Sequence, residues 1–321
     1  MYCIISTFNK TFDEIGLIYF IPVFLEKVLS VGQIVEVPIW TKIEIALVLT
    51  IWSLENLNTL KIKEEKIKSI ISIKNDNIFL NNKQLELAKF ISKYYFTHIH
   101  NSVSLFFPRG LRLKIKDNKI GDLKKIEDKI NYNFNFEKKL SNKQEELFNE
   151  ISNNSGKFLL HWVTWSWKTE IYIRLIKEQL DLWKQSLLLI PEIILTNQLE
   201  LRLKKVFWEN ILVINSSVTE WNKIKAWKLI YNNKSKIIIW TRSSLFYPYK
   251  NLWLIIIDEE HDNSYQSDQA PRYNSLEIAN KISDIYWNKL LLASWTPSIK
   301  SMYQAIKGKY KLLKLLEKFG K

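Results

Sequence analysis

Apolar runs and helix-like segments alternate along the second half of the chain. Six runs have the length and two-sided apolar character of buried strands: Phe158–His161, Ser186–Ile190, Ile211–Ile214, Ile237–Ile239, Leu254–Ile257 and Leu290–Ala293. Short apolar strands separated by helices are typical of a parallel sheet that is covered on both faces. The pattern therefore predicts an α/β domain in which helices pack on both faces of a parallel sheet.

The first half of the chain has a different pattern. Three apolar runs stand between turn signals: Ile34–Pro38, Ala46–Ile51 and Ile67–Ile73. They predict a small β-rich domain. Helical periodicity follows at Lys83–Tyr95, and Ser102–Phe107 extends this helical part.

A charged segment separates the two halves. From about residue 109 to 140 the sequence is rich in Lys and Asn and offers little material for a core, which is typical of a linker or a reduced subdomain. We therefore expect three parts, at residues 1–108, 109–140 and 141–321.

The composition contains an anomaly. The chain has 13 Trp and only 7 Gly, so glycine makes up about 2% of it, against ~7% in ordinary proteins. Reading twelve of the tryptophans as glycine would raise the glycine share to about 6%. Several tryptophans stand where glycine usually punctuates a chain: Trp40, Trp183, Trp240 and Trp253.

One group of tryptophans bears directly on chemistry. With glycine in place of Trp162, Trp165 and Trp167, residues 162–169 read G-V-T-G-S-G-K-T, which is a complete P-loop. Such a loop wraps its backbone N–H groups around phosphates, and glycine tolerates the positive φ angles and the close approach that this requires. As written, the bulky indoles should block the ATP site.

We infer that the gene is read in a code in which UGA specifies glycine, and that the printed sequence renders UGA as tryptophan. The alternative is a protein that is genuinely rich in tryptophan. The codons distinguish the two, because UGG at positions 162, 165 and 167 would contradict the recoding hypothesis.

Charge and cysteine usage narrow the class of protein. The net charge of +14 suits a polyanionic partner, although AT-rich codon usage alone also enriches Lys, Asn and Ile. Cys3 is the only cysteine, which excludes an internal disulfide and a cysteine-based zinc cluster. No signal peptide is evident, and Pro191 and Glu192 interrupt the apolar run Leu187–Leu195. We expect a soluble cytoplasmic protein with no membrane-spanning segment.

An acidic motif follows one of the predicted core strands. Asp258 and Glu259 come directly after Leu254–Ile257, about 90 residues beyond the P-loop. Asp258 is placed to hold Mg²⁺ together with Thr169, Glu259 to polarise the attacking water, and Lys168 to contact the phosphates. A single Asp-Glu pair is usually a solvated turn, but its place at the carboxyl end of a core strand favours the catalytic interpretation.

A third motif, Ser294–Thr296, ends another predicted strand and reads S-G-T with glycine at 295. Ser and Thr at a strand end are ordinary turn chemistry when they stand alone. In third place after the P-loop and the acidic motif, they indicate an element that senses nucleotide and nucleic acid together.

Residues 158–310 resemble the first motor lobe of the PriA family (primosomal protein N′), the replication-restart DNA helicases of superfamily 2. The matching pieces are Trp162–Glu170, Pro191–Thr196, Trp240–Phe246, Asp258–Tyr265, Pro271–Tyr273 and Ser294–Ser298. The family carries glycine at positions 162, 165, 167, 240 and 253, and it tends to have tryptophan at Trp227, which we expect to be the one true tryptophan. The resemblance implies a RecA-like P-loop motor lobe that uses ATP and Mg²⁺, preceded by a small β-rich DNA-binding domain.

The resemblance also implies roles for single residues. Gln144 resembles the adenine-reading glutamine of the family, and Asp262–Tyr273 resembles an aromatic-rich loop that couples DNA binding to hydrolysis. The candidate DNA contacts are Tyr19, Trp40, Lys68, Arg242, Tyr265, Arg272 and Tyr273. The first three lie in the domain that, in the family, pockets the 3′ end of a nascent strand. Tyrosines in the loop suit stacking on bases, and the alternative is that they pack on the lobe.

Parts of the family pattern are missing. There is no room for a winged-helix domain between about residues 110 and 140, and the sequence lacks the second motor lobe, its arginine finger and the cysteines that hold zinc. We therefore expect an ATP-dependent 3′→5′ DNA helicase of replication restart that hydrolyses ATP poorly as this chain alone. Its implied partners are forked and single-stranded DNA, primosome proteins and single-strand-binding proteins. The alternatives are a non-catalytic fork-DNA binding module and another superfamily 2 DNA translocase.

Overall fold

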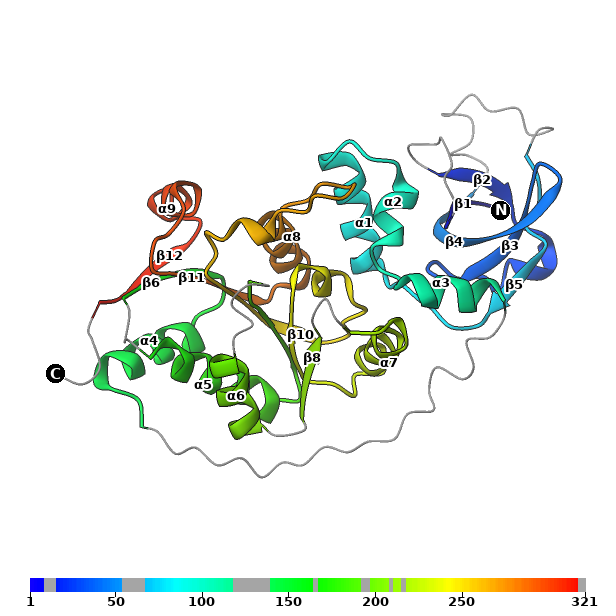
Figure 1. The fold of residues 1–321 in the computed structure, drawn as a ribbon. Coiled ribbons are helices and arrows are strands. Elements are labelled where there is room, and N and C mark those ends of the chain that lie inside the picture. The colour runs from blue at the N-terminus through cyan, green and yellow to red at the C-terminus, as the bar shows by residue number, and fades with distance from the viewer. Residues whose placement is uncertain are drawn as a thin grey trace. The chain divides into compact units, whose positions relative to one another are not determined.

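The structure is a computed structural model that describes residues 1–8, 16–53, 67–117, 139–163, 167–191, 197–207, 210–214 and 218–316. The chain divides into two compact units (Figure 1). The amino-terminal unit comprises residues 1–121 and 269–272, and the lobe comprises residues 122–268 and 273–321. None of the helices in the described ranges is long and apolar enough to cross a bilayer.

A seven-stranded parallel sheet forms the centre of the lobe. Its strand order is β12-β6-β11-β10-β7-β9-β8, and all neighbouring pairs are parallel. The strands are β6 Lys157–Trp162, β7 Gln185–Leu189, β8 Ile211–Ile214, β9 Ile237–Trp240, β10 Leu252–Asp258, β11 Lys289–Ser294 and β12 Lys311–Leu315. The six predicted strands are confirmed. The edge strand β12 was not predicted, because its short Lys-Leu-Leu-Lys-Leu pattern lacks a continuous apolar run.

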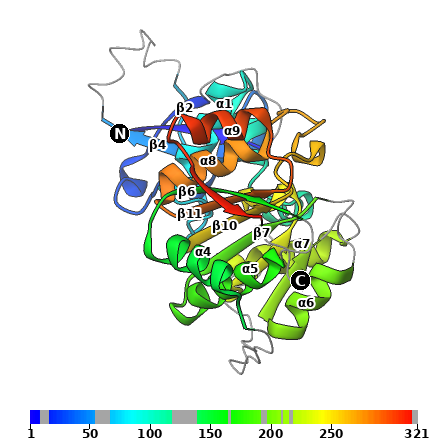
Figure 2. The ribbon, with the colours of Figure 1, turned by 90° about the vertical axis from the view of Figure 1, so that its left-hand side faces the viewer.

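Helices cover both faces of this sheet. They are α4 Asn142–Asn153, α5 Lys168–Asp181, α6 Asn197–Phe207, α7 Glu220–Tyr231, α8 Ser275–Tyr286 and α9 Ile299–Ile306. Figure 2 shows α4, α5 and α6 on one face and α8 and α9 on the other. The prediction of an α/β, RecA-like lobe with a covered parallel sheet is confirmed.

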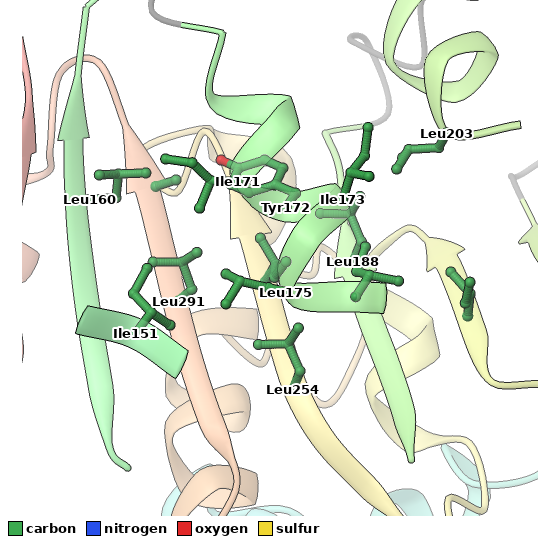
Figure 3. Packing of buried hydrophobic residues seen from close by; sticks show 14 of the residues in the cluster. Ile151, Leu160, Ile171, Tyr172, Ile173, Leu175, Leu188, Leu203, Leu254 and Leu291 are labelled. Atoms are coloured by element: carbon green, nitrogen blue, oxygen red, sulfur yellow. The ribbon is translucent and has the colours of Figure 1, made fainter. Parts of the chain in front are cut away.

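Helix α5 packs along the middle of the sheet (Figure 3). Its Ile171 and Leu175 are fully buried in the cluster that also holds Leu188, Leu254 and Leu291 from three strands. Burying a side chain of this size contributes about 1.5–3 kcal/mol. Because α5 begins at residue 168, this packing fixes the position of the predicted phosphate-binding lysine relative to the strand ends.

The amino-terminal unit contains a five-stranded antiparallel sheet with the order β2-β1-β4-β3-β5. The strands are β1 Tyr2–Thr7, β2 Leu17–Phe20, β3 Ile34–Ile39, β4 Lys42–Trp52 and β5 Ser72–Asn75. The predicted β-rich domain is confirmed. The predicted run at 67–73 is wrong in its bounds, because the strand begins only at Ser72 and the preceding residues pair singly, through Ser69 with Phe20.

Three helices complete the amino-terminal unit, namely α1 Asn82–Tyr94, α2 Ile99–Ser104 and α3 Arg109–Lys116. The predicted helix at 83–95 is confirmed. The segment expected to be a linker from 109 onward begins as a helix, because Leu111 and Ile115 lie one turn apart and are fully buried. Residues 118–138 lie outside the described residues.

Tryptophans occupy unusual backbone positions in this fold. Trp40, Trp167, Trp183 and Trp287 have φ values of 52°, 52°, 58° and 57°, in the left-handed region that costs a residue with a Cβ about 1–2 kcal/mol. Their side chains are exposed. Trp227 is the opposite case, since it lies inside α7, is fully buried and stacks on Tyr231 at 5.1 Å. Four tryptophans thus stand where glycine is favoured.

Candidate nucleotide-binding site

Three loops meet at the carboxyl edge of the parallel sheet. Strand β11 lies between β6 and β10, and its Ala293 pairs with Leu160 on one side and with Asp258 on the other. The loops after β6, β10 and β11 carry the predicted P-loop, the acidic motif and Ser294–Thr296. The topology therefore brings three motifs that are far apart in the sequence to one place.

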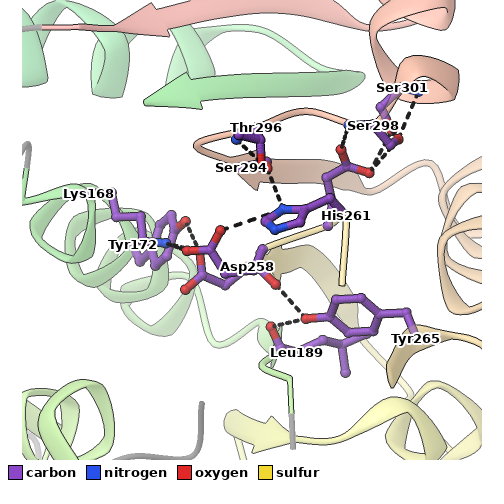
Figure 4. Close-up of polar contacts among 12 residues, drawn as sticks. Lys168, Tyr172, Leu189, Asp258, His261, Tyr265, Ser294, Thr296, Ser298 and Ser301 are labelled. Carbon is purple, nitrogen blue, oxygen red and sulfur yellow. Dashed lines mark hydrogen bonds and ion pairs between the residues drawn. The ribbon is translucent and has the colours of Figure 1, made fainter. Parts of the chain in front are cut away.

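Lys168 is held by both predicted acids (Figure 4). Its Nζ donates to Asp258 Oδ1 at 2.5 Å and to Glu259 Oε1 at 2.7 Å. All three side chains are largely buried. A buried ammonium group needs such partners to offset the loss of water, so the lysine rests on the carboxylates in the absence of a phosphate.

Tyr172, one turn further along α5, also contacts the acidic motif. Its hydroxyl donates to Asp258 Oδ1 at 2.9 Å. Burial, and then the negative charge of Asp258, raises the pKa of Tyr172 well above its ordinary value, so the phenol keeps its proton and remains a donor. Sequence reasoning did not identify this residue; its only signal was a polar group on the otherwise apolar face of a helix.

Glu259 has the environment of a general base. Burial raises the pKa of its carboxyl group, and the opposing charge of Lys168 offsets part of that rise. Its Oε2 is buried and accepts no hydrogen bond from the described residues, while His261 Nδ1 lies 3.8 Å away. The backbone of Glu259 is left-handed, with φ of 49°, as is often seen at functional sites. A carboxylate oxygen with spare acceptor capacity can take a proton from water.

The acidic motif is joined to the third motif by His261. Its Nδ1 lies 2.7 Å from Ser294 Oγ, and the same hydroxyl oxygen accepts a hydrogen bond from the Thr296 N–H at 3.1 Å. Ser294 is fully buried. His261 thus connects Ser294 of the third motif to Glu259 of the acidic motif.

The tryptophans affect the predicted P-loop directly. Trp162 places its ring 3.6 Å from Lys168 Nζ, and its indole Nε1 is buried with no hydrogen-bond partner among the described residues. Trp167 takes a left-handed conformation immediately before α5. Trp165 lies outside the described residues. An indole against the ammonium group competes for the space that a phosphate needs.

Gln144 and Thr169 lie near this loop. Gln144 is buried in a capping box with Ser141 at the start of α4, and its Nε2 donates to the Trp167 carbonyl at 3.4 Å. Thr169 is the second residue of α5. The hydroxyl of Thr169 and the carboxylate of Asp258 are oxygen ligands of the kind that Mg²⁺ prefers. Such an ion, when bound with ATP, would supply positive charge against the phosphates.

Two tyrosines of the aromatic-rich loop are buried. The hydroxyl of Tyr265 donates to the Asp258 carbonyl at 2.6 Å and lies 3.2 Å from the Leu189 carbonyl. Tyr273 packs edge-on against Phe246 at 4.8 Å. As folded here, neither ring is open to stack on a base. Tyr265 instead fastens the loop to the strand that carries the acidic motif, and Tyr273 packs on Phe246.

The two arginines of the predicted DNA contacts differ. Arg242 donates from Nη1 to the backbone carbonyls of Ser264 and Gln266 at 2.8 and 2.6 Å, so its guanidinium group holds the same loop in place. Arg272 is exposed. DNA contact by either arginine remains a prediction.

The amino-terminal unit brings its predicted residues together. Lys68 Nζ donates to the Trp40 carbonyl at 3.4 Å, and the Tyr19 hydroxyl donates to the Pro38 carbonyl at 2.9 Å. Burial, and then the charge of nearby Cys3, raises the pKa of Tyr19 to about 12. Trp40 and Lys68 are exposed, whereas Tyr19 is buried. A lysine beside an exposed turn is suited to contact a phosphate group or the end of a nucleic-acid strand.

The chain matches two families of domains. Residues 141–304 match the DEAD/DEAH box helicases, and residues 7–108 match the 3′ DNA-binding domain of PriA. Among the described residues no group of three or more His, Cys, Asp or Glu is arranged to hold a metal ion. The helicase match covers residues of the lobe, and the match to the 3′ DNA-binding domain covers residues of the amino-terminal unit.

Curated relatives agree with these matches. The chain is 34% identical to the replication restart protein PriA of Rickettsia felis over 305 residues, which cover 94% of the chain and 44% of that protein. It is 39% identical to PriA of Helicobacter pylori over 231 residues, which cover 72% and 35%. The chain thus spans less than half the length of these relatives.

Solved structures are similar at the level of the fold. One is RecG bound to a three-way DNA junction, with 20% identity, a TM-score of 0.43 and coverage of 73% of this chain and 31% of that one. Another is the Hef helicase domain of Pyrococcus furiosus, with 17% identity, a TM-score of 0.41 and coverage of 53% and 37%.

The helicase family match spans half of the chain's residues, so the chain belongs to the DEAD/DEAH box helicases. Its amino-terminal match and its relatives show that it corresponds to the amino-terminal part of PriA.

Proposed function

We propose that the chain is the DNA-binding and nucleotide-binding part of an ATP-dependent 3′→5′ DNA helicase that acts in replication restart in the cytoplasm. The observation that carries the proposal is the placement of Lys168 between Asp258 and Glu259 at the carboxyl edge of the sheet. A lysine at the start of a helix, facing two acids, is the arrangement that P-loop enzymes use to bind a nucleoside triphosphate with Mg²⁺.

The proposed chemistry follows from these contacts. Lys168 leaves the carboxylates and donates to the β- and γ-phosphates, and the N–H groups at the start of α5 add partial positive charge. Asp258 and Thr169 would hold Mg²⁺, and Tyr172, which donates to Asp258, keeps that carboxylate oriented after the lysine has left. Glu259 accepts the proton of the attacking water through its free oxygen.

The proposal requires glycine at positions 162, 165 and 167. Trp162 contacts the lysine that must reach the phosphates, and Trp167 takes a backbone conformation that glycine adopts without strain. Hydrolysis in such motors commonly depends on an arginine supplied across a cleft. We therefore expect the chain to bind nucleotide more readily than it hydrolyses it.

DNA recognition is assigned to two places. In the amino-terminal unit, Tyr19, Trp40 as glycine, and Lys68 are proposed to take the 3′ end of a strand at a fork. The second place is the aromatic-rich loop Asp262–Tyr273, which is proposed to respond to single-stranded DNA. Arg272 lies on this loop, Arg242 holds it from outside, and the buried Tyr265 and Tyr273 are proposed to act through its position. Primosome and single-strand-binding proteins are proposed as partners.

The direct test is ATP hydrolysis by a full-length protein that contains this chain with glycine at the twelve recoded positions, measured with and without forked DNA. We expect stimulation by the fork, and loss of hydrolysis in Lys168→Ala and Glu259→Gln. Lys168→Ala should also lose nucleotide binding, whereas Glu259→Gln should retain it, because the glutamine removes the base and leaves the lysine.

A second candidate function is a fork-DNA binding module without catalysis. The contact of Lys68 with the exposed turn at Trp40 favours it, because that part of the chain needs no nucleotide to meet DNA. Fork binding with no nucleotide binding would support this alternative. Stimulation by duplex DNA and by forks alike would instead indicate a different superfamily 2 translocase.

A further inference from the structure

Helix α9 is attached to the lobe in an unusual way. Ser301 is the only buried residue among Ile299–Ile306, and all residues of this helix are described. Three of its large apolar side chains are exposed, with Ile299 at 91%, Tyr303 at 53% and Ile306 at 76%, while Met302 and Ala305 are half-buried. Apolar packing on α9 is therefore limited, and polar contacts contribute to its position.

One polar contact is an ion pair between Lys300 and Glu277 of α8. The others, at the start of the helix, converge on Glu260. Its Oε1 accepts a hydrogen bond from the Ser298 N–H at 2.6 Å. Its Oε2 accepts hydrogen bonds from the hydroxyls of Ser298 at 3.1 Å and Ser301 at 2.8 Å. Ser298 is the N-cap of α9. The two serines are labelled in Figure 4, at the start of this helix.

Glu260 is well suited to hold a helix end. It is 2% exposed, so its hydrogen bonds are shielded from competing water. A carboxylate at a helix N-terminus is favoured by the partial positive charge of the free N–H groups. Its two oxygens accept from one N–H and two hydroxyls, which matches the acceptor capacity of the group.

The same residue lies next to the acidic motif. Glu260 directly follows Asp258 and Glu259, and its own N–H donates to the Ala293 carbonyl at 3.0 Å on the neighbouring strand β11. Its side chain and its backbone therefore connect the loop after β10 to both ends of the segment that leads from β11 into α9. A shift of the acidic motif cannot occur without moving or breaking these bonds.

We propose that Glu260 is a positioning residue that couples α9 to the acidic motif, so that α9 moves when a nucleotide rearranges Asp258 and Glu259. This inference rests on the proposed function, because it takes a nucleoside triphosphate as the cause of the rearrangement. Lys168 now donates to both acids, and its transfer to phosphates would release them. Glu260 transmits that release to the start of α9, where Ser298 and Ser301 donate to it.

The coupling predicts a graded response to substitution. Glu260→Ala removes all three acceptor contacts. Glu260→Gln keeps a carbonyl for the Ser298 N–H, and its amide can donate to the serine hydroxyls, which rotate to accept. Thr219→Ala is the matched control, because Thr219 caps α7 through the Asn222 N–H and belongs to another part of the lobe.

The first measurement is amide hydrogen exchange of the full chain with glycine at 162, 165 and 167, without nucleotide. In Glu260→Ala, amides at 298–306 should exchange about tenfold faster than in the parent, while Glu260→Gln should lie near the parent. Thr219→Ala should accelerate exchange only at the start of α7. Unchanged exchange of α9 in Glu260→Ala would overturn the attachment.

The second measurement adds Mg²⁺ and a non-hydrolysable ATP analogue. The parent should change its exchange at 298–306 on binding, and Glu260→Ala should bind the analogue yet lose that change. An identical nucleotide response in Glu260→Ala, or a parent that binds nucleotide without any response in α9, would overturn the coupling. A parent that binds no nucleotide would instead overturn the proposed function, and Glu260 would then be judged by the first measurement.

Discussion

The interior of α7 and the end of α5 accommodate tryptophan in opposite ways. Trp227 is fully buried within α7 and stacks on Tyr231 at an interplanar angle of 10°. Trp183 lies just beyond α5, is 57% exposed and has φ of 58°. One position uses the indole as a core side chain, whereas the other uses only the backbone, in a conformation that glycine adopts most readily.

The end of α9 shows what the end of α5 resembles. After α9, Gly308 donates to the Ala305 carbonyl and Lys309 to the Gln304 carbonyl. After α5, Trp183 and Lys184 make the equivalent bonds, to Leu180 and Gln179. This pair of backbone hydrogen bonds is the Schellman motif, whose left-handed residue is usually glycine or asparagine. Tryptophan at 183 therefore occupies a glycine position by geometry as well as by sequence.

The difference between the two regions teaches how such substitutions are tolerated. At the end of α5 the indole of Trp183 is exposed to solvent, so the backbone hydrogen bonds of the helix end are kept. The only cost is the strain of a left-handed backbone at a residue with a Cβ. At the end of β6, the ring of Trp162 lies 3.6 Å from Lys168 Nζ, so the same substitution is expected to affect binding. Fold and function therefore respond differently to the same change of residue.

The largest expected effect concerns Trp227. Trp227→Ala should lower the free energy of unfolding by about 3–5 kcal/mol, because it leaves a large cavity in a closed core. Its control is Trp221→Ala in the first turn of the same helix, where the side chain is 62% exposed and the change should stay within about 0.5 kcal/mol. Urea unfolding followed by circular dichroism measures both. Equal losses of unfolding free energy in the two variants would mean that burial of the Trp227 ring does not stabilise the fold.

The next effect concerns the nucleotide. Replacing Trp162, Trp165 and Trp167 by glycine should strengthen Mg-ATP binding by about 100-fold or more, which corresponds to ~2.7 kcal/mol. The reason is that the phosphate site loses the indole against Lys168, and that glycine allows the backbone angles at which the N–H groups of a P-loop face phosphates. Titration with a fluorescent ATP analogue measures the change.

Its control carries glycine at Trp183 and Trp287, which also take left-handed backbone angles but belong to helix ends. Nucleotide affinity should not change in that variant. A similar gain in both variants would show that general stabilisation, and not the phosphate loop, is responsible.

Much of this site could be predicted because its motifs are local in sequence. The P-loop lysine and the acid pair follow strands whose apolar runs are unmistakable, and parallel topology places strand ends at one edge. Tyr172 and Glu260 could not be predicted, because their partners, Asp258 and Ser298, are distant in sequence and only packing shows the contact. The local sequence pattern also does not report burial, and for this reason Tyr265, which is buried, was predicted to contact DNA.

The fold follows the same rule. Strands of the parallel sheet are apolar on both sides and were predicted to within two residues. The edge strand β12 and helix α3 were not predicted, because each has only a few buried residues and many lysines. Their stability comes from the elements they pack on, and sequence periodicity alone does not report such neighbours.

A smaller effect is expected at the helix ends. Trp183→Gly and Trp287→Gly should each raise the free energy of unfolding by about 1 kcal/mol, because the left-handed backbone no longer carries a Cβ. Gly308→Ala is the mirror experiment: an added Cβ meets nothing within 4 Å there, so strain alone should cost about 1 kcal/mol. Urea unfolding followed by circular dichroism suits all three. A loss of stability in the two tryptophan variants would show that their indoles hold the helix ends.

The smallest expected effect is the pH dependence of Glu259. Burial raises the pKa of this group above the ordinary 4.5, so its ionised form is less favourable in the fold than in the unfolded chain. The stability that goes with a raised carboxyl pKa is complete below the ordinary value and is lost as the pH rises through the raised one. Glu259→Gln is neutral at every pH, and it should therefore raise the melting temperature at pH 7 and change it little near pH 4.

Lys168 makes this effect small, because its charge offsets part of the burial cost in the parent and remains buried in the variant. Calorimetric melting curves between pH 4 and pH 8 measure it, with the exposed Glu86→Gln in α1 as a control that should show no such trend. A gain that is equal at all pH values, or a loss at pH 7, would mean that the ion pair with Lys168 outweighs burial. In that case the carboxylate would be held as a structural partner of the lysine rather than kept ready to accept a proton.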